Sequence, residues 1–143
     1  MTDARPVFDG INLVTRDMDA SVAFYRRLGA DIPDRDPAWD PHHRSANTDG
    51  GPDFDLDSEV FAHRWDEGWR DGTRCVLGFK VASREAVDDL YAELTGAGYR
   101  GQQPPYDAFW GARYAIVEDP DENPVGLMSP VHPSMRSDIT PPS

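Results

Sequence analysis

Two carboxylates, Asp55 and Asp57, are the most direct candidates for chemistry in this sequence. They alternate with the apolar residues Phe54 and Leu56, and alternation of this kind is typical of a strand whose residues i and i+2 share one face. Carboxylates that share a face can raise the pKa of one another, which suits acid/base work, or attract a cation. The simpler interpretation is a pair of solvated surface aspartates.

Three histidines offer a second possibility, a metal site built from His42, His43 and His63 with Asp40 or Asp57. Zinc and related ions are commonly held by such side chains. Adjacent histidines on a strand point to opposite faces, so His42 and His43 cannot both bind one ion there. We therefore favour ordinary surface histidines.

Large aromatic side chains form the third candidate feature. Several of them fall in the segment PPYDAFWGARY, near one edge of the expected sheet. Such residues usually pack in a core or an interface, but they also build stacking walls for flat or cationic ligands. Beside Asp55 and Asp57, they would suit a cationic aromatic compound. The aromatic residues in question are Trp39, Trp65, Trp69, Phe109, Trp110 and Tyr114.

Composition narrows the class of protein. The 143 residues suit one domain, and 26 acidic against 14 basic residues give a net charge of −12. This charge argues against a nucleic-acid partner, because phosphate binding needs clustered Lys and Arg; solubility alone is the simplest reason for it. With no apolar stretch long enough for a membrane and no signal core, we expect a cytoplasmic protein. The single cysteine, Cys75, excludes an internal disulfide, and we expect it to be a small buried side chain.

Two segments that would position these residues resemble each other. Residues 13–28 and 79–94 align at an offset of 66 residues, which places Tyr25 on Tyr91, and each reads as a strand followed by a helix. Asp19 and Ser83 are the expected helix caps, and glycines follow both helices. The side chains expected to face inward from the first helix are Phe24, Tyr25 and Leu28.

The strand of each copy alternates in the same way. Ile11 and Leu13 should pack on the helix, and Gly10, Asn12 and Val14 should face away from it. The rest of the chain predicts short strands on both sides of the turn at 49–51, a short helix within 59–69, and strands near 99–103, 112–118 and 124–129. Each copy then reads βαβββ, an α+β arrangement in which the two copies must pair. The tail at 131–143 is rich in Pro and Ser, and we expect it to be frayed or to pack across a partner subunit.

The repeat, with the motifs RDMDASVAFYRRLG, REAVDDLYAELTGAG and FWGARYAIVEDPDEN, resembles the vicinal oxygen chelate superfamily of glyoxalase I, extradiol dioxygenases and bleomycin-resistance proteins. The resemblance covers residues 7–130, with Glu122 standing where the family turn usually has glycine. It implies one domain over 1–130, with module one at about 7–60 and module two at about 74–129. The two paired βαβββ modules would form a cup-shaped mixed sheet, commonly in a homodimer.

Enzymes of this superfamily hold a divalent metal on His, Glu or Gln from the first and last strands of each module. The matching positions here are Gly10, Asp55, Val76 and Gly126, and only Asp55 carries a side chain that can bind metal. A shift of one residue would bring in Asp9 and Cys75, but it would also turn the apolar set off the helix. We therefore expect no metal cofactor.

The resemblance and the missing ligands favour a protein that binds or sequesters a small drug or metabolite, cationic or aromatic, as bleomycin-resistance proteins do. The alternative is a lyase, isomerase or dioxygenase of the same superfamily with a relocated metal or metal-free acid/base chemistry. A third possibility is a structural or regulatory dimer without a small ligand. The residues expected to bind the ligand are Asn12, Asp55, Asp57, Trp110, Tyr114 and Met128.

Overall fold

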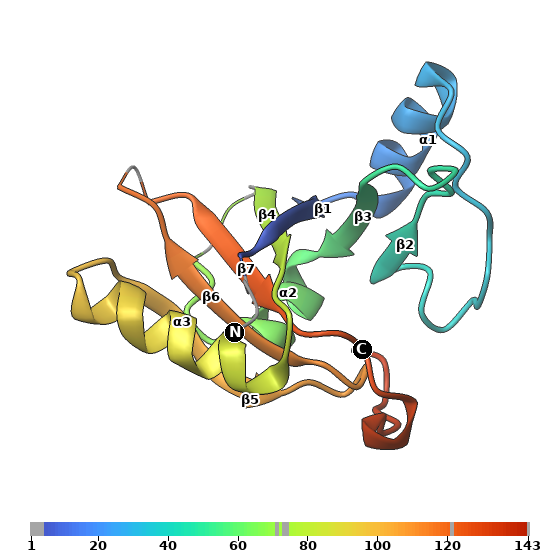
Figure 1. Ribbon diagram of the computed structural model, residues 1–143. Helices are drawn as coiled ribbons and strands as arrows, with labels where there is room; N and C mark the ends of the chain where they lie inside the picture. The colour runs from blue at the N-terminus through green and yellow to red at the C-terminus, as the bar shows by residue number, and fades with distance from the viewer. Residues whose placement is uncertain (1–4, 71, 73–74, 121, 143) are drawn as a thin grey trace.

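The computed structural model describes residues 5–70, 72, 75–120 and 122–142. Within them, seven strands form one mixed sheet in the order β2-β3-β1-β4-β7-β6-β5, with three α-helices (Figure 1). The strands are β1 (Val7–Thr15), β2 (His43–Ser45), β3 (Asp53–Ser58), β4 (Cys75–Lys80), β5 (Gly101–Asp107), β6 (Arg113–Glu118) and β7 (Pro124–Met128). The helices are α1 (Met18–Leu28), α2 (Glu59–Trp65) and α3 (Arg84–Gly96). The expected α+β class and mixed sheet are confirmed.

The two modules pair within the chain through their first strands. β1 and β4 run antiparallel, with Ile11 opposite Leu77, Gly10 opposite Gly78 and Asn12 opposite Val76. Each first strand also pairs in parallel with the last strand of its own module, β1 with β3 and β4 with β7. The offset of 66 residues in the sequence therefore reflects a local twofold relation between the modules.

The modules differ in their number of strands. The second runs β4-α3-β5-β6-β7, the expected βαβββ order, whereas the first runs β1-α1-β2-β3 and has one strand fewer. An isolated bridge between Asp31 and Asn47 stands where the additional strand would begin. Pro33, Pro37 and Pro41 follow, and proline has no N–H to donate to a ladder. The segment therefore crosses the surface as a loop.

The capping residue of one helix was predicted correctly and that of the other was not. Ser83 caps α3 by accepting a hydrogen bond of 3.0 Å from the N–H of Ala86. In α1 the cap is Asp17, which accepts from the N–H of Ala20 at 3.0 Å; Asp19 lies two residues too late, in the first turn. Gly29 ends α1 at a φ of 109°, which suits glycine.

The apolar stripe of α1 also differs from the prediction. Met18 and Val22 are buried and Tyr25 is partly buried, so the inward stripe of α1 follows spacings of four and three residues. Leu13 of β1 is partly buried against them. Phe24 falls off this stripe and is 57% exposed, which makes its predicted inward orientation wrong. The side chain of Leu28 lies outside the described residues.

The predicted alternation of β1 is confirmed by the packing on the two faces of the sheet. Leu13 belongs to the cluster under α1, whereas Val14 packs on the opposite face with Val76, Phe61 and Trp65. Phe61 and Trp65 come from α2, the predicted short helix, which covers one end of the concave face. Cys75, expected to be buried, is exposed at the start of β4.

The tail folds back on its own chain. A 3₁₀ turn at Pro133–Met135 follows a hydrogen bond of 2.9 Å from the N–H of His132 to the carbonyl oxygen of Gly111. The N–H of Ser137 donates to Phe109 at 2.9 Å, and Ile139 packs against the cluster on the concave face. The described part of the tail, through residue 142, is thus docked and not frayed.

A test of the close approach of β1 and β3 follows from Gly10. A Cβ at this position would lie 2.5 Å from the backbone oxygen of Asp53, so Gly10→Ala forces the two strands apart. We expect a loss of about 1–3 kcal/mol in the free energy of unfolding, measured by urea denaturation. Gly96→Ala is the matched control: nothing lies within 4 Å of its added Cβ, and we expect no loss. Equal stability of the two variants would contradict the close approach.

Candidate functional site

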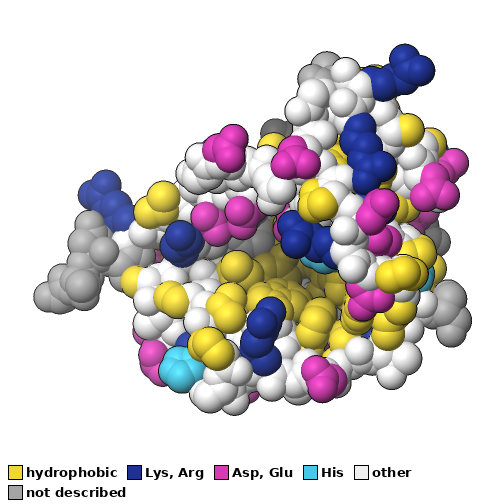
Figure 2. All heavy atoms as spheres, turned by 90° about the vertical axis from the view of Figure 1, so that its right-hand side faces the viewer, with side chains coloured by type: hydrophobic (Ala, Val, Ile, Leu, Met, Phe, Trp, Pro, Cys, Tyr) yellow, Lys and Arg dark blue, Asp and Glu magenta, His cyan; other side chains and the backbone are white. Residues whose placement is uncertain are grey.

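A cavity of about 380 Å³ opens on the concave face of the sheet, within the range of about 300–1,000 Å³ that is usual for small-molecule sites. Figure 2 shows a face on which apolar side chains surround a hollow, with acidic and basic side chains on the rim. Strands β1, β3, β4, β6 and β7, helix α2 and the tail all contribute to the walls. The cavity is lined by all six predicted residues, Asn12, Asp55, Asp57, Trp110, Tyr114 and Met128.

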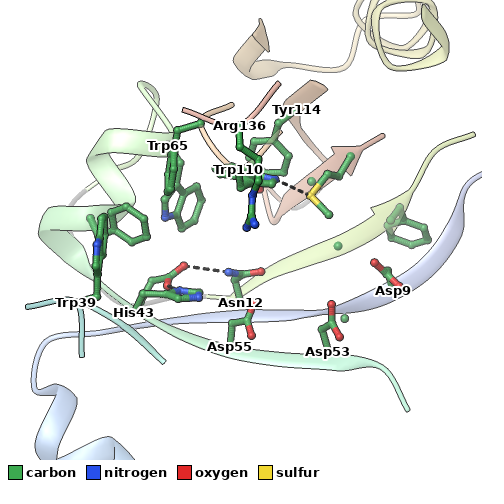
Figure 3. Close-up of a pocket in the computed structure, with 18 residues that line it drawn as sticks. Asp9, Asn12, Trp39, His43, Asp53, Asp55, Trp65, Trp110, Tyr114 and Arg136 are labelled. Atoms are coloured by element: carbon green, nitrogen blue, oxygen red, sulfur yellow. Dashed lines mark hydrogen bonds and ion pairs between the residues drawn. The ribbon is translucent and has the colours of Figure 1, made fainter. Parts of the chain in front are cut away.

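One wall of the cavity is acidic. Asp53 and Asp55 project from β3 because residues two apart share a face, and Asp9 joins them from β1 (Figure 3). The pairing of β1 with β4 shifts register between Phe8 and Gly10, so Asp9 and Gly10 both line the cavity. The amino group of Lys80 lies 3.6 Å from the Asp9 carboxylate and offsets its charge.

Asp57 holds the site together and presents little free charge. Its side chain is 2% exposed, and its Oδ1 lies 2.5 Å from Nδ1 of His43. Asn12 donates to the other oxygen at 2.9 Å. Ser45 Oγ lies 3.3 Å from the far nitrogen of His43, Nε2. Both oxygens of Asp57 are therefore occupied within the chain, and they fix the orientation of His43 and Asn12.

The electrostatics of this group favour a proton on His43 and near-neutral titration of Asp55. Burial raises the pKa of Asp55 to about 6, because the His43 charge and the Ser45 hydrogen bond only partly offset the loss of water. Burial opposes protonation of His43, but the hydrogen bond and charge of Asp57 outweigh it and raise the pKa of His43. The predicted perturbation of the Asp55 pKa by Asp57 is present, but it is smaller than the effect of burial.

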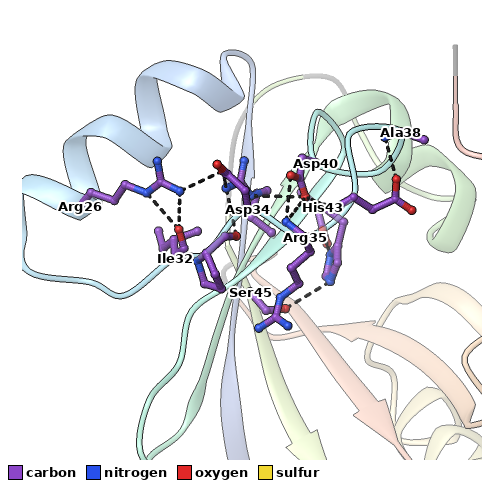
Figure 4. A network of polar contacts seen from close by, with 12 residues as sticks. Arg26, Ile32, Asp34, Arg35, Ala38, Asp40, His43 and Ser45 are labelled. Atoms are coloured by element: carbon purple, nitrogen blue, oxygen red, sulfur yellow. Dashed lines mark hydrogen bonds and ion pairs between the residues drawn. The ribbon is translucent and has the colours of Figure 1, made fainter.

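A polar network secures the loop that leads into β2, the strand that carries His43 (Figure 4). The guanidinium of the buried Arg44 lies 2.7 Å from the Asp34 carboxylate, and Arg26 of α1 reaches the same carboxylate at 3.1 Å. Arg26, first, and then Arg44 lower the pKa of Asp34. The Asp40 carboxylate accepts from the N–H of Arg35 at 3.1 Å. These contacts replace the ladder bonds that the prolines of the loop cannot make.

The opposite wall is aromatic. Trp110 meets Tyr114 edge-to-face at 5.3 Å between ring centroids, and Trp65 meets Tyr114 at 6.4 Å. The indole N–H of Trp110 donates to the sulfur of Met128 at 3.2 Å. The ring of Trp65 lines the cavity, and its buried indole N–H has no hydrogen-bond partner among the described residues.

The positions of the superfamily metal ligands do not form a donor set here. A Cβ at Gly126 would lie 2.9 Å from the Tyr114 hydroxyl, so Tyr114 fills the space that a ligating side chain would need. At Gly10, backbone atoms of Asp53 fill the space that a side chain would occupy. Val76 is buried in the apolar cluster that includes Phe61 and Trp65. The residues present do not fit a divalent metal.

The alternative metal site built from histidines is not assembled either. His42 Nδ1 lies 2.9 Å from Ser58 Oγ, whereas His43 faces Asp57. Among the described residues no group of three or more His, Cys, Asp or Glu side chains could hold a metal ion.

Some lining residues were not identified from the sequence. Asp53 is one of them, although it continues the period of two set by Asp55 and Asp57, and this signal could have identified it. Asp9 and His43 were considered only as metal ligands. Arg136 lies in a tail without periodicity, and no sequence signal placed it at a cavity.

The sequence-family model of the Glyoxalase/Bleomycin resistance protein/Dioxygenase superfamily matches residues 7–127 of this chain. The chain belongs to this superfamily. A bleomycin resistance protein from Klebsiella pneumoniae is 30% identical over 112 residues, which cover 77% of this chain and 82% of that protein.

Solved structures of superfamily members share the fold. The Mn(II)-bound glyoxalase from Novosphingobium aromaticivorans matches with a TM-score of 0.63 and 20% identity, over 96% of this chain and 44% of that one. An extradiol ring-cleaving dioxygenase from B. fuscum matches with a TM-score of 0.62 and 18% identity, over 90% of this chain and 34% of that one. The chain spans less than half of each of these two enzymes. At such identities the likeness concerns the fold alone.

The raised pKa of Asp55 predicts a pH-dependent stability. Its folded-state pKa of about 6 exceeds the ordinary 3.8, so the folded state binds the proton more tightly and stability falls as pH rises from about 4 to 6. Asp55→Asn removes this partly buried charge. We expect this variant to exceed the native protein in free energy of unfolding by about 1–3 kcal/mol at pH 8, and by little at pH 4.

Urea denaturation of both proteins from pH 4 to 8 measures this difference. Asp53→Asn is the matched control, because Asp53 lies on the same strand face but is exposed, and we expect a change below about 0.5 kcal/mol. A difference between Asp55→Asn and the native protein that does not vary with pH would refute a raised pKa at Asp55.

Proposed function

We propose that the protein binds and sequesters a small aromatic cation in this cavity without a metal ion. The observation that carries the proposal is the Asp55 carboxylate, partly buried on the cavity wall opposite Trp110 and Tyr114. Ionised Asp55 has lost water without gaining a full counter-ion, so a ligand cation would lower its free energy. An aromatic frame attached to that cation would stack on the opposite wall.

The charge of the whole chain supports the same ligand class. A net charge of −12 attracts cations from solution and raises their rate of association. The matched bleomycin resistance protein shows that this superfamily includes a protein named for resistance to a drug. The lack of a donor set at Gly10, Val76 and Gly126 supports binding without metal chemistry.

Isothermal titration calorimetry with benzylamine and benzyl alcohol tests the proposal, because the two probes share a ring and differ in charge. We expect benzylamine to bind about tenfold tighter than benzyl alcohol at pH 7.5, a difference of about 1.4 kcal/mol. Its affinity should fall as pH drops below 6, where Asp55 becomes protonated. Asp55→Asn should remove most of the preference for the amine.

Asp49→Asn is the control, because Asp49 lies in the exposed turn between β2 and β3 and changes the net charge equally. Its affinity for benzylamine should match that of the native protein. Equal affinity of the native protein for the amine and the alcohol would refute a cation site.

A second candidate is a lyase or isomerase that uses metal-free acid/base chemistry, and the pKa of about 6 at Asp55 favours it. An acid/base side chain works best when its pKa lies near the working pH. This function predicts exchange of the α-hydrogens of acetophenone in D₂O, followed by NMR, with loss of exchange in Asp55→Asn. Absence of exchange would count against this second candidate.

We further propose that the protein works in the cytoplasm as a homodimer. None of the described helices is long and apolar enough to cross a membrane. Val7 and Phe8 at the start of β1 are 62% and 45% exposed, and Phe24 on α1 is also exposed, which gives a second copy apolar surface to cover.

A further inference from the structure

Arg136 places a cation at the mouth of the acidic cavity. Figure 3 shows its side chain reaching into the cavity between Trp110 and Asn12, from the side opposite Asp53 and Asp55. The tail that carries it is held by backbone bonds on both sides, from His132 to Gly111 and from Ser137 to Phe109. The position of Arg136 is therefore fixed by the fold, while its long side chain remains exposed to the cavity.

The guanidinium of Arg136 makes no ion pair within 4.0 Å with any described residue. Several arginines are paired: Arg26 and Arg44 share Asp34, and Arg84 and Arg113 share Asp107. Exposed arginines such as Arg27 are also without an ion pair to a described residue, but among the described arginines Arg136 is the one that lines the cavity and faces its carboxylates.

The carboxylates opposite Arg136 are not equivalent. Asp9 is offset by Lys80 at 3.6 Å, and Asp57 is bonded to His43 and Asn12. Asp53 and Asp55 remain to receive a cation. The cavity thus has a negative end on β3 and a positive end on the tail, with the gap between them wider than an ion pair.

From this arrangement we infer that the ligand is bipolar, an aromatic molecule with an amine for Asp53 and Asp55 and a carboxylate for Arg136. The inference rests on the proposed function and narrows its ligand class. A guanidinium binds a carboxylate through two parallel hydrogen bonds, and its planar, preorganised donors fix the direction of approach. A purely cationic ligand would be repelled at the mouth, whereas a bipolar one would be attracted at both ends.

Four probes built on one ring test the inference by calorimetry at pH 7.5. They are benzylamine, benzyl alcohol, benzoate and 4-(aminomethyl)benzoate, which carries both charges. We expect 4-(aminomethyl)benzoate to bind the native protein at least tenfold tighter than benzylamine, and benzoate to bind most weakly. In Arg136→Gln the affinity for 4-(aminomethyl)benzoate should fall about tenfold or more, while benzylamine binds equally well or better.

Two control variants separate the charge of Arg136 from other effects. Arg27→Gln removes an exposed arginine of α1, which does not line the cavity, and should leave all affinities unchanged. Arg64→Gln removes the hydrogen bond of 3.0 Å to the backbone oxygen of Thr140, and so weakens tail docking without touching the Arg136 charge. A similar loss in Arg64→Gln and Arg136→Gln would assign the effect to tail docking and overturn the inference.

The outcomes distinguish this inference from the proposed function. If benzylamine outbinds benzyl alcohol but 4-(aminomethyl)benzoate is no tighter than benzylamine, the cation site stands and the bipolar ligand is wrong. If Arg136→Gln improves binding of both amines, Arg136 is an internal counter-ion that a cationic ligand displaces, and the inference is overturned. If no amine outbinds benzyl alcohol, the proposed function fails together with the inference.

Discussion

The antiparallel pairing of β1 with β4 is the contact on which the rest of the structure depends. Each module can bury only one face of its strands against its own helix, and the joined first strands bring the remaining faces together as one concave surface. Gly10 and Gly78 are opposite each other at this junction, so the floor of the cavity lacks side chains there. The walls, which come from β3, β6 and α2, can therefore enclose a space.

The repeat and the strand alternation predicted two paired strand–helix modules, because both reflect burial on one face at a time, and the family resemblance added their arrangement in one curved mixed sheet. They did not predict the reduced first module, where three prolines outweigh the pattern expected from the second copy. The error at Phe24 has a similar cause: two adjacent aromatics cannot both lie on one helix stripe, and Tyr25 takes the inward position. Glu122, unusual for the family turn, adopts a φ of 69° that glycine would adopt more easily.

The candidate site was predictable in its strands and not in its tail. Alternation identified Asp55 and Asp57 on one face, but it could not assign their different roles. Those roles depend on His43, which the antiparallel pairing of β2 with β3 places opposite Asp57, a cross-strand register that alternation within one strand does not reveal. Arg136 is placed by backbone bonds to the segment 109–111, and such long-range contacts leave no local pattern.

Tyr114 beside Gly126 also bears on how proteins of this fold exchange one function for another. A glutamate introduced at Gly126 alone would collide with the phenol, and a smaller residue introduced at Tyr114 alone would leave a void among Trp65, Tyr106 and Trp110. Either single step passes through a destabilised intermediate. The residues at positions 114 and 126 are thus expected to change together. Restoring a ligating glutamate at Gly126 would require a second substitution at Tyr114.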